Sequence, residues 1–167
     1  MTVSIPEGVG LQEHFAPHNA CFGCGPANEK GLRIRSVPET GSESGSEQGR
    51  VVCRWTPEPH HEAFPGVLNG GIIGAILDCH CNWTAAWHLA RLRDLDTPPC
   101  CVTMEFKVQL RRPTPSDREL TLVAWPTGVD GDIVTVESEL TVDDTVYDRC
   151  TGRFVAVKPG HPAYHRW

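Results

Sequence analysis

The chain has 167 residues, of which 40% are hydrophobic and 22% charged, and its formal net charge is −6. This length fits one domain that buries about 70% of its unfolded surface, so we expect a single domain over residues 1–167. The negative charge argues against nonspecific binding to nucleic acid or to an anionic membrane.

The first ten residues, MTVSIPEGVG, lack the basic and apolar regions of a signal peptide. The longest apolar run, in the middle of the chain, contains too many polar residues for a membrane span. We therefore expect a cytoplasmic protein with no membrane partner.

The chain contains eight cysteines, which we expect to be reduced because no secretion signal is present. Cys21 and Cys24 have the spacing of metal ligands, but no second Cys-x-x-Cys motif follows them. Cys79, His80 and Cys81 could add ligands from a helix, although consecutive helical positions cannot all face one ion. The sequence therefore predicts small buried thiols and no metal site, and it leaves the role of Cys21 and Cys24 open.

The N-terminal part of the chain is expected to be an irregular lead-in over residues 1–30, because proline and glycine favour turn after turn. Phe15 and Phe22 are expected to pin this lead-in to the body. Alternating patterns predict short strands over 32–35 and 50–55. The segment 38–49 between them is polar and has too few apolar residues to pack a core. A loop rich in proline and histidine continues to Leu68.

The stretch that follows Asn69 predicts one long helix that ends near residues 96–99, and Asn69 is its expected N-cap. Gly70, Gly71 and Gly74 each cost about 1 kcal/mol of helix propensity, which suggests a close approach of backbone or ligand. A helix that is apolar on nearly every face is normally buried on nearly every face. Asp78 is an acid in this setting and costs several kcal/mol unless it is paired or used, so it is the first catalytic candidate.

Four strands joined by turns are predicted after the helix, over residues 100–112, 119–125, 133–142 and 146–157. One face of the first strand is expected to carry the apolar residues Val102, Met104, Phe106, Val108 and Leu110. An antiparallel sheet that curls around a central helix buries both apolar surfaces, which places the chain in the α+β class. Residues 159–167 are expected to form a loosely attached tail.

Three strings carry a resemblance to a known family: CFGCGPANEKGLRI at 21–34, PGVLNGGIIGAILD at 65–78 and TMEFKVQLRRPTP at 103–115. In order and spacing they resemble the hotdog-fold acyl-CoA thioesterases, especially the phenylacetyl-CoA thioesterase-like branch, over about residues 20–157. The resemblance implies a hotdog fold, a homodimer or dimer of dimers, and hydrolysis of acyl-CoA thioesters without a cofactor. It also implies active sites at the dimer interface, where the glycine segment of one subunit faces the helix Asp of the other.

Thioester hydrolysis needs an attacking group and a stabiliser for the oxyanion. Asp78 can act as general base on water or as nucleophile, and the sequence does not separate these roles. The unpaired N–H groups around Gly70 and Gly71 form a candidate oxyanion hole at the positive end of the helix. Thr103 falls where many relatives place a Ser or Thr that orients the water. Asn82, four residues after Asp78, is expected to hydrogen-bond the carboxylate.

The phosphates of coenzyme A need cations, and several basic residues fall near the strand over 100–112 and its turn. They are predicted to form a local basic patch on an acidic protein. The candidates are Lys107, Arg111, Arg112 and Arg118, with Arg33 and Arg35 as alternatives.

Two departures from the family pattern favour a second hypothesis, a noncatalytic protein that binds acyl-CoA or another small ligand. Asn69 stands where the family usually has His and cannot take protons at neutral pH, and Ala63 replaces a catalytic Asn or Gln of some relatives. A hotdog hydratase ranks lower because Trp83 occupies the position of the hydratase His. His80 lies about 200° around the helix from Asp78 and is expected to be a core histidine with its hydrogen bonds satisfied.

Overall fold

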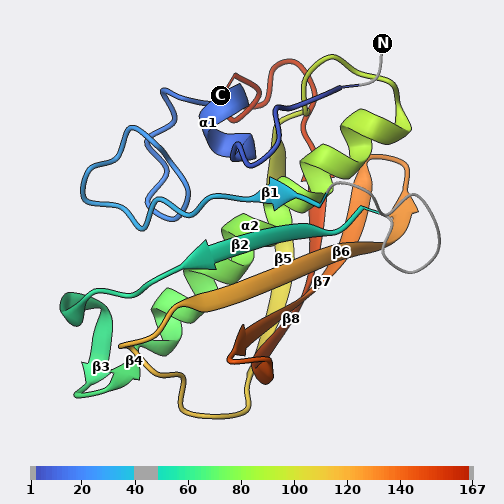
Figure 1. Ribbon diagram of the computed structural model, residues 1–167. Coiled ribbons are helices and arrows are strands. Elements are labelled where there is room, and N and C mark those ends of the chain that lie inside the picture. The colour runs from blue at the N-terminus through green and yellow to red at the C-terminus, as the bar shows by residue number, and fades with distance from the viewer. Residues whose placement is uncertain (1–2, 40–48, 166–167) are drawn as a thin grey trace.

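A computed structural model of the protein describes residues 3–39 and 49–165, so most of the polar segment over 38–49 lies outside the described ranges. Six antiparallel strands form one sheet in the order β1-β2-β6-β7-β8-β5. They are β1 (Val37–Pro38), β2 (Val51–Trp55), β5 (Cys101–Leu110), β6 (Leu120–Asp130), β7 (Ile133–Val142) and β8 (Thr145–Ala156). Figure 1 shows the sheet curling around the long helix α2 (Gly70–Leu92), which confirms the α+β hotdog architecture.

Helix α2 starts and ends close to where the sequence predicted. The Asn69 side chain caps it, since its Oδ1 accepts hydrogen bonds from the backbone N–H of Gly71 at 2.8 Å and of Ile72 at 3.4 Å. The helix ends at Leu92, and Asp94 with φ +51° turns the chain away. Residues 80–87 are buried without exception, because the sheet covers one side of the helix and the N-terminal segment packs on it as well.

The strand predicted over 32–35 is not formed. Arg33 has φ +52°, in the left-handed region, and its guanidinium donates to the carbonyl of Pro26. Leu32 and Ile34 are buried in the core, which explains the alternating pattern without a strand. The short strand β1 lies instead two residues further along the chain and pairs with β2.

The lead-in contains a short helix that the sequence reading missed, α1 (Leu11–Phe15). Its Gln12 begins a buried hydrogen-bond chain: Nε2 of Gln12 donates to Oγ of Ser36 at 2.9 Å, and that oxygen lies 2.8 Å from Nδ1 of His80. Nε2 of His80 lies 3.1 Å from the carbonyl oxygen of Val51. Burial lowers the pKa of His80 to about 4, so it is the neutral core histidine that was expected.

The two phenylalanines expected to pin the lead-in differ in their placement. The ring of Phe15 lies 6.4 Å from that of Trp87, so it packs on α2 as expected. Phe22 is 52% exposed and does not pin the segment. At the other end of the chain, residues 159–165 form turns that are mostly exposed.

The loop before α2 is more ordered than its composition indicated. It holds a 3₁₀ turn (Pro59–His61) and a small hairpin of β3 (Glu62–Phe64) and β4 (Val67–Leu68). Gly66 turns the hairpin with φ +81°, a conformation that favours glycine. Figure 1 shows this hairpin beside the first turn of α2, so it borders the helix start.

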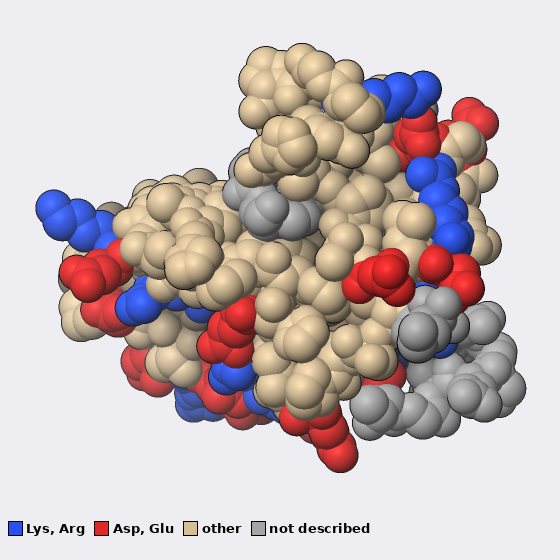
Figure 2. Space-filling view, turned by 90° about the horizontal axis from the view of Figure 1, so that it is seen from above, with Lys and Arg blue, Asp and Glu red and all other residues tan. Residues whose placement is uncertain are grey.

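Charged side chains of both signs are mixed on the molecular surface. In the view of Figure 2, acids and bases gather around the margins, and the middle of the face carries few charges. Arg35 pairs with Glu13 at 2.7 Å and Arg93 with Asp132 at 2.9 Å. In the described part of the chain, no helix is long and apolar enough to cross a membrane.

Candidate active site

The centre of the candidate site is a hydrogen bond between α2 and β5. Oγ1 of Thr103 donates to Oδ1 of Asp78 at 2.7 Å, and both residues are half-buried. The sequence suggested both residues separately, and the structure brings them together. The nearby Cys81 thiol has a raised pKa because of the neighbouring Cys150 thiol, its burial and the Asp78 carboxylate.

A β-bulge explains why Thr103 reaches Asp78. The pairing of β5 with β8 shifts register between Thr103 and Glu105, so Met104 is an extra residue in the strand. Alternation therefore changes phase there, and Thr103 faces the helix together with Phe106, although an uninterrupted strand would put them on opposite faces. The predicted single apolar face, with Val102 and Met104 in line with Phe106, is wrong for this reason.

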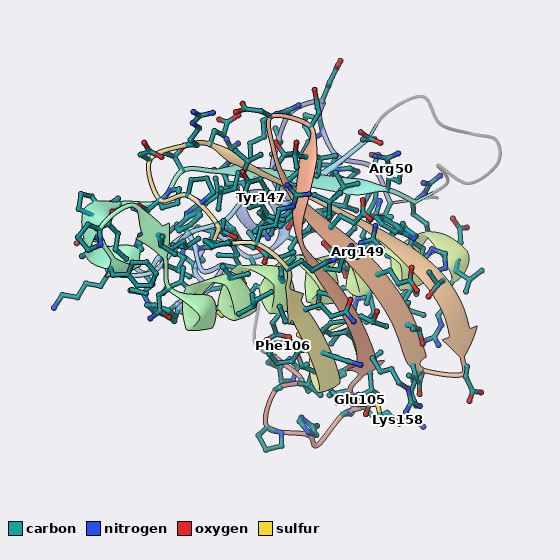
Figure 3. The ribbon with its side chains drawn as sticks, turned by 90° about the horizontal axis from the view of Figure 1, so that it is seen from below. Arg50, Glu105, Phe106, Tyr147, Arg149 and Lys158 are labelled. Atoms are coloured by element: carbon teal, nitrogen blue, oxygen red, sulfur yellow. The ribbon has the colours of Figure 1, made fainter. Side chains whose placement is uncertain are left out.

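Beyond the bulge, β5 lies close to the glycines of α2. A Cβ on Gly70 would come within 3.0 Å of Cδ1 of Leu110, and one on Gly74 within 3.8 Å of the Phe106 ring. Figure 3 shows Phe106 on the side of β5 next to α2. The neighbour at Gly70 is a side-chain methyl group, whereas the sequence suggested the approach of a backbone or a ligand.

The start of α2 offers two backbone donors that differ in availability. The N–H of Gly71 is already bonded to the Asn69 carboxamide. The N–H of Gly70 has no hydrogen-bond acceptor among the described residues. Asn69 and Gly71 are exposed and Gly70 is half-exposed, so a ligand can approach this helix end.

Within one chain, the helix start and the carboxylate are separated. Gly70 and Asp78 are eight residues apart on one helix, which is about 12 Å along its axis. One thioester carbonyl cannot contact both groups at that distance. The two halves of the predicted site therefore do not meet within a single chain.

A groove runs beside the helix start and has a volume of about 360 Å³. Its wall includes Gly70 and Ile73 from α2, Leu110 from β5 and Phe64 from the hairpin. The guanidinium-bearing residues Arg111 and Arg112 complete it, and the guanidinium of Arg112 lies 6.0 Å from the ring of Tyr147, which Figure 3 labels on β8.

The predicted basic patch is divided. Arg111 and Arg112 line the groove, whereas Lys107 lies on the opposite face of β5 from Phe106 by strand alternation. Arg118 forms an ion pair with Asp143. The alternatives are also engaged, because Arg33 donates to Pro26 and Arg35 pairs with Glu13.

Asn82 and Trp83 have partners other than those expected. Nδ2 of Asn82 donates to the carbonyl oxygen of Cys101 at 3.1 Å, and no described residue hydrogen-bonds its Oδ1. The Asp78 carboxylate accepts a hydrogen bond from Thr103, and the Asn82 amide group is directed at Cys101. Nε1 of Trp83 donates to Sγ of Cys24 at 3.4 Å, away from the carboxylate.

Three cysteines gather outside the candidate active site. The sulfur atoms of Cys21, Cys24 and Cys79 all lie within 4.8 Å of one another. His80 and Cys81 point elsewhere, as helical geometry required, since His80 bonds Ser36 and Cys81 lies beside Cys150. These three thiols are the group that could hold a metal ion in the described ranges.

Exposed apolar side chains lie on β5, and α2 beside it is only partly covered. β5 is the last strand of the sheet that the described residues form, so one of its edges faces no neighbouring strand there. Met104, Phe106 and Leu110 on this strand are 48%, 44% and 56% exposed. Gly71, Gly74 and Asp78 follow one another at helical spacing on a face of α2 that is not fully covered.

Comparison with known proteins is consistent with this architecture. Residues 65–147, about half of the chain, match the model of the Thioesterase superfamily. No curated protein matches the chain. A thioesterase superfamily protein of known structure is 24% identical with a TM-score of 0.65, and the alignment covers 81% of this chain but only 62% of that protein.

Two further structures match over most of their own length. A thioesterase superfamily protein from Shewanella loihica PV-4 is 26% identical over 75% of this chain and 91% of its own, with a TM-score of 0.59. The E. coli PaaI protein from the phenylacetic acid degradation operon is 12% identical over 76% and 81%, with a TM-score of 0.60. The order of elements, the central helix and these matches lead to one conclusion: the chain belongs to the thioesterase superfamily and has the hotdog fold.

Proposed function

We propose that the protein is an acyl-CoA thioesterase that works as a homodimer and uses Asp78. The observation that carries the proposal is the hydrogen bond from Thr103 to the half-buried Asp78 carboxylate at 2.7 Å. A hydroxyl that donates to one oxygen restricts the orientation of the carboxylate, which is the group proposed to accept a proton from water.

Hydrolysis then proceeds in two steps, addition to the thioester carbonyl and collapse of the oxyanion. Asp78 takes a proton from water, the hydroxide adds to the thioester carbon, and the carbonyl oxygen becomes an oxyanion. The oxyanion collapses, the C–S bond breaks, and the proton passes to the leaving thiolate, which yields a carboxylic acid and coenzyme A. A covalent route, in which Asp78 attacks the carbon and water opens the resulting anhydride, uses the same residue.

The oxyanion donor in this scheme comes from the partner subunit. Gly70 N–H is the uncommitted donor at the helix start, and about 12 Å of helix separates it from Asp78 of the same chain. A two-fold dimer that joins the β5 edges and packs the half-covered helix faces together would cover the exposed apolar side chains of β5. It would also bring Gly70 of the partner subunit toward Asp78. Pairing of such dimers into a tetramer is compatible with the same site.

Coenzyme A would lie in the groove beside the helix start. Arg111 and Arg112 provide positive charge for its phosphates, and Leu110 and Phe64 provide apolar contacts for the pantetheine arm. Lys107 and Arg118 are not used in this proposal, because Lys107 faces the other side of β5 and Arg118 is paired with Asp143.

The first test is hydrolysis of short, long and aromatic acyl-CoA esters, followed with a thiol reagent. We expect turnover with at least one ester and its loss in Asp78→Asn, an isosteric change that removes the base. Turnover by Asp78→Asn at the wild-type rate would overturn the assignment. A single turnover in ¹⁸O-water tests the covalent route, since ¹⁸O in the Asp78 carboxylate shows that water opened an anhydride at that residue.

The second test asks whether the site is shared between subunits. Gly70→Pro removes the N–H at the first helical position, where proline fits the backbone, although the Leu110 methyl group must shift to make room for its Cβ. Each of Gly70→Pro and Asp78→Asn alone should be inactive. Refolded together in equal amounts, they should regain about a quarter of the wild-type activity, because half of the dimers are mixed and each has one intact site. No regain, with mixed dimers present, would contradict a shared site.

One observation favours a second candidate function, binding without catalysis. The Asn69 side chain accepts the hydrogen bond from the Gly71 N–H and cannot act as a base. The side chain of Ala63 has no amide group that could take part in catalysis. A binding protein would show saturable acyl-CoA binding by calorimetry with no release of thiol over hours.

A further inference from the structure

The cluster of Cys21, Cys24 and Cys79 joins two distant parts of the chain. Cys21 and Cys24 lie in the lead-in, and Cys79 lies on α2 immediately after Asp78. The sulfur atoms of Cys21 and Cys79 are 3.8 Å apart, and all three sulfurs lie within 4.8 Å of one another. Cys24 is buried and the other two are half-buried, so the cluster is reachable from the surface.

Hydrogen-bond donors converge on these sulfurs. The backbone N–H groups of Gly23 and Cys24 face Sγ of Cys21. The indole N–H of Trp83 points at Sγ of Cys24. N–H groups directed at a sulfur are the contacts that also support a cysteine ligand in a metal site.

The turn that carries Cys21 and Cys24 depends on two glycines. Gly25 N–H closes the turn on the carbonyl of Cys21 at 2.8 Å, and a Cβ on Gly25 would lie 2.4 Å from the backbone N of Cys21. A Cβ on Gly23 would lie 2.4 Å from Sγ of Cys79. The absence of side chains at these two positions is therefore what lets the third sulfur approach the other two.

We propose that Cys21, Cys24 and Cys79 bind one thiolate-preferring divalent metal ion, zinc, with a fourth position open to a water or another external ligand. Zinc binds sulfur at about 2.3 Å in tetrahedral geometry, which places two ligand sulfurs about 3.8 Å apart. The Cys21–Cys79 distance matches this spacing, and small rotations of the cysteine side chains bring Cys24 to it as well. The sequence expectation of unliganded thiols is revised by this proposal.

The proposed ion would fasten the lead-in to α2 one residue from Asp78. The Gln12–Ser36–His80 hydrogen bonds already join these segments one residue further along the helix. Metal binding would therefore restrict the movement of α2 at the candidate active site without contributing a ligand to the reaction. The inference is independent of the proposed thioesterase activity and is tested without turnover.

The test titrates the reduced, metal-free protein with cobalt(II), whose thiolate complexes absorb in the near ultraviolet and visible. We expect a thiolate-to-cobalt band that saturates at one ion per chain and is displaced by zinc. Zinc should also raise the melting temperature of the wild-type protein. In Cys79→Ala the affinity for cobalt should fall by roughly 100-fold or more, since one of three protein ligands is lost.

Two further variants make the test specific. Cys100→Ala removes a buried thiol outside the cluster and should titrate as the wild type does. Trp83→Phe keeps an aromatic ring and removes the N–H donor to Cys24, and should weaken binding by roughly 10-fold. Circular dichroism of each variant checks that it is folded. Loss of metal binding through unfolding is thereby distinguished from loss of a ligand.

Three results would overturn the proposal. The first is a protein with eight titratable thiols that shows no cobalt–thiolate absorption. The second is an equal loss of binding in Cys79→Ala and Cys100→Ala. The third is a mass lower by two hydrogens with a Cys21–Cys79 peptide crosslink in the protein as purified from cells, which would make the cluster a disulfide pair.

Discussion

The hydrogen bond between Thr103 and Asp78 gives a quantitative prediction for Thr103→Val. Valine keeps the shape of the side chain and removes the hydroxyl that donates to the carboxylate at 2.7 Å. A hydrogen bond to a charged group contributes about 1.5–3 kcal/mol, and the half-exposed setting of Thr103 favours the lower end. One factor of ten corresponds to about 1.4 kcal/mol, so we expect kcat to fall by roughly 10- to 30-fold.

The assay is the steady-state hydrolysis of the best acyl-CoA ester, with kcat and KM measured separately. KM should change little, because Thr103 contacts the carboxylate and does not line the coenzyme A groove. Thr103→Ser keeps the hydroxyl and should retain most of the activity. An unchanged kcat in Thr103→Val, with Asp78→Asn inactive, would refute the role of Thr103 in positioning the carboxylate.

Three further predictions concern stability. The pKa of His80 in the folded protein is about 4, below its ordinary value of 6.5. The contribution of neutral His80 to the free energy of unfolding should therefore be fully present above pH 6.5. It should fall by on the order of 3 kcal/mol as the pH drops toward 4. Urea unfolding across this range measures it, and a slope unchanged in His80→Gln would contradict the assignment. Gly25→Ala should lower the free energy of unfolding by on the order of 3 kcal/mol, because its Cβ would meet backbone atoms of Asn19 and Cys21 at 2.4 Å. A melting temperature equal to that of the wild type would contradict this. Asn69→Ala should lower the free energy of unfolding by about 1 kcal/mol, because the helix loses its cap. Its kcat should be equal to or higher than that of the wild type, since the Gly71 N–H is released. An inactive but folded Asn69→Ala protein would show that the carboxamide itself is needed.

The long helix and the long strands of the fold were predictable from the sequence. The helix after Asn69 and the four strands after it have lengths and patterns that leave little choice, and they carry most of the core. Asp78 was indicated by its charge in an apolar helix and Thr103 by the family resemblance, and the structure places the two in contact. The order of the strands in the sheet also needed the structure, because β5 pairs with β8 and not with its neighbour in sequence.

The parts that could not be predicted depend on contacts between distant segments. The alternation of Leu32 and Ile34 resembles a strand, but the positive φ of Arg33 breaks it, and only tertiary packing selects that conformation. The convergence of Cys79 with the Cys21-x-x-Cys24 turn is likewise a property of the packed lead-in. The signal that could have indicated it is the glycine at position 23, which is required by a sulfur 56 residues away in the chain.

The extra residue Met104 divides β5 into two segments that serve different parts of the site. Residues before it present Thr103 to Asp78, and residues after it present Phe106 and Leu110 to the helix glycines and the groove. Removing Met104 would restore uninterrupted alternation, so the segment 101–103 would exchange its faces while the rest of the strand kept its own. A one-residue insertion or deletion here can therefore replace the side chain beside the carboxylate without changing the substrate groove.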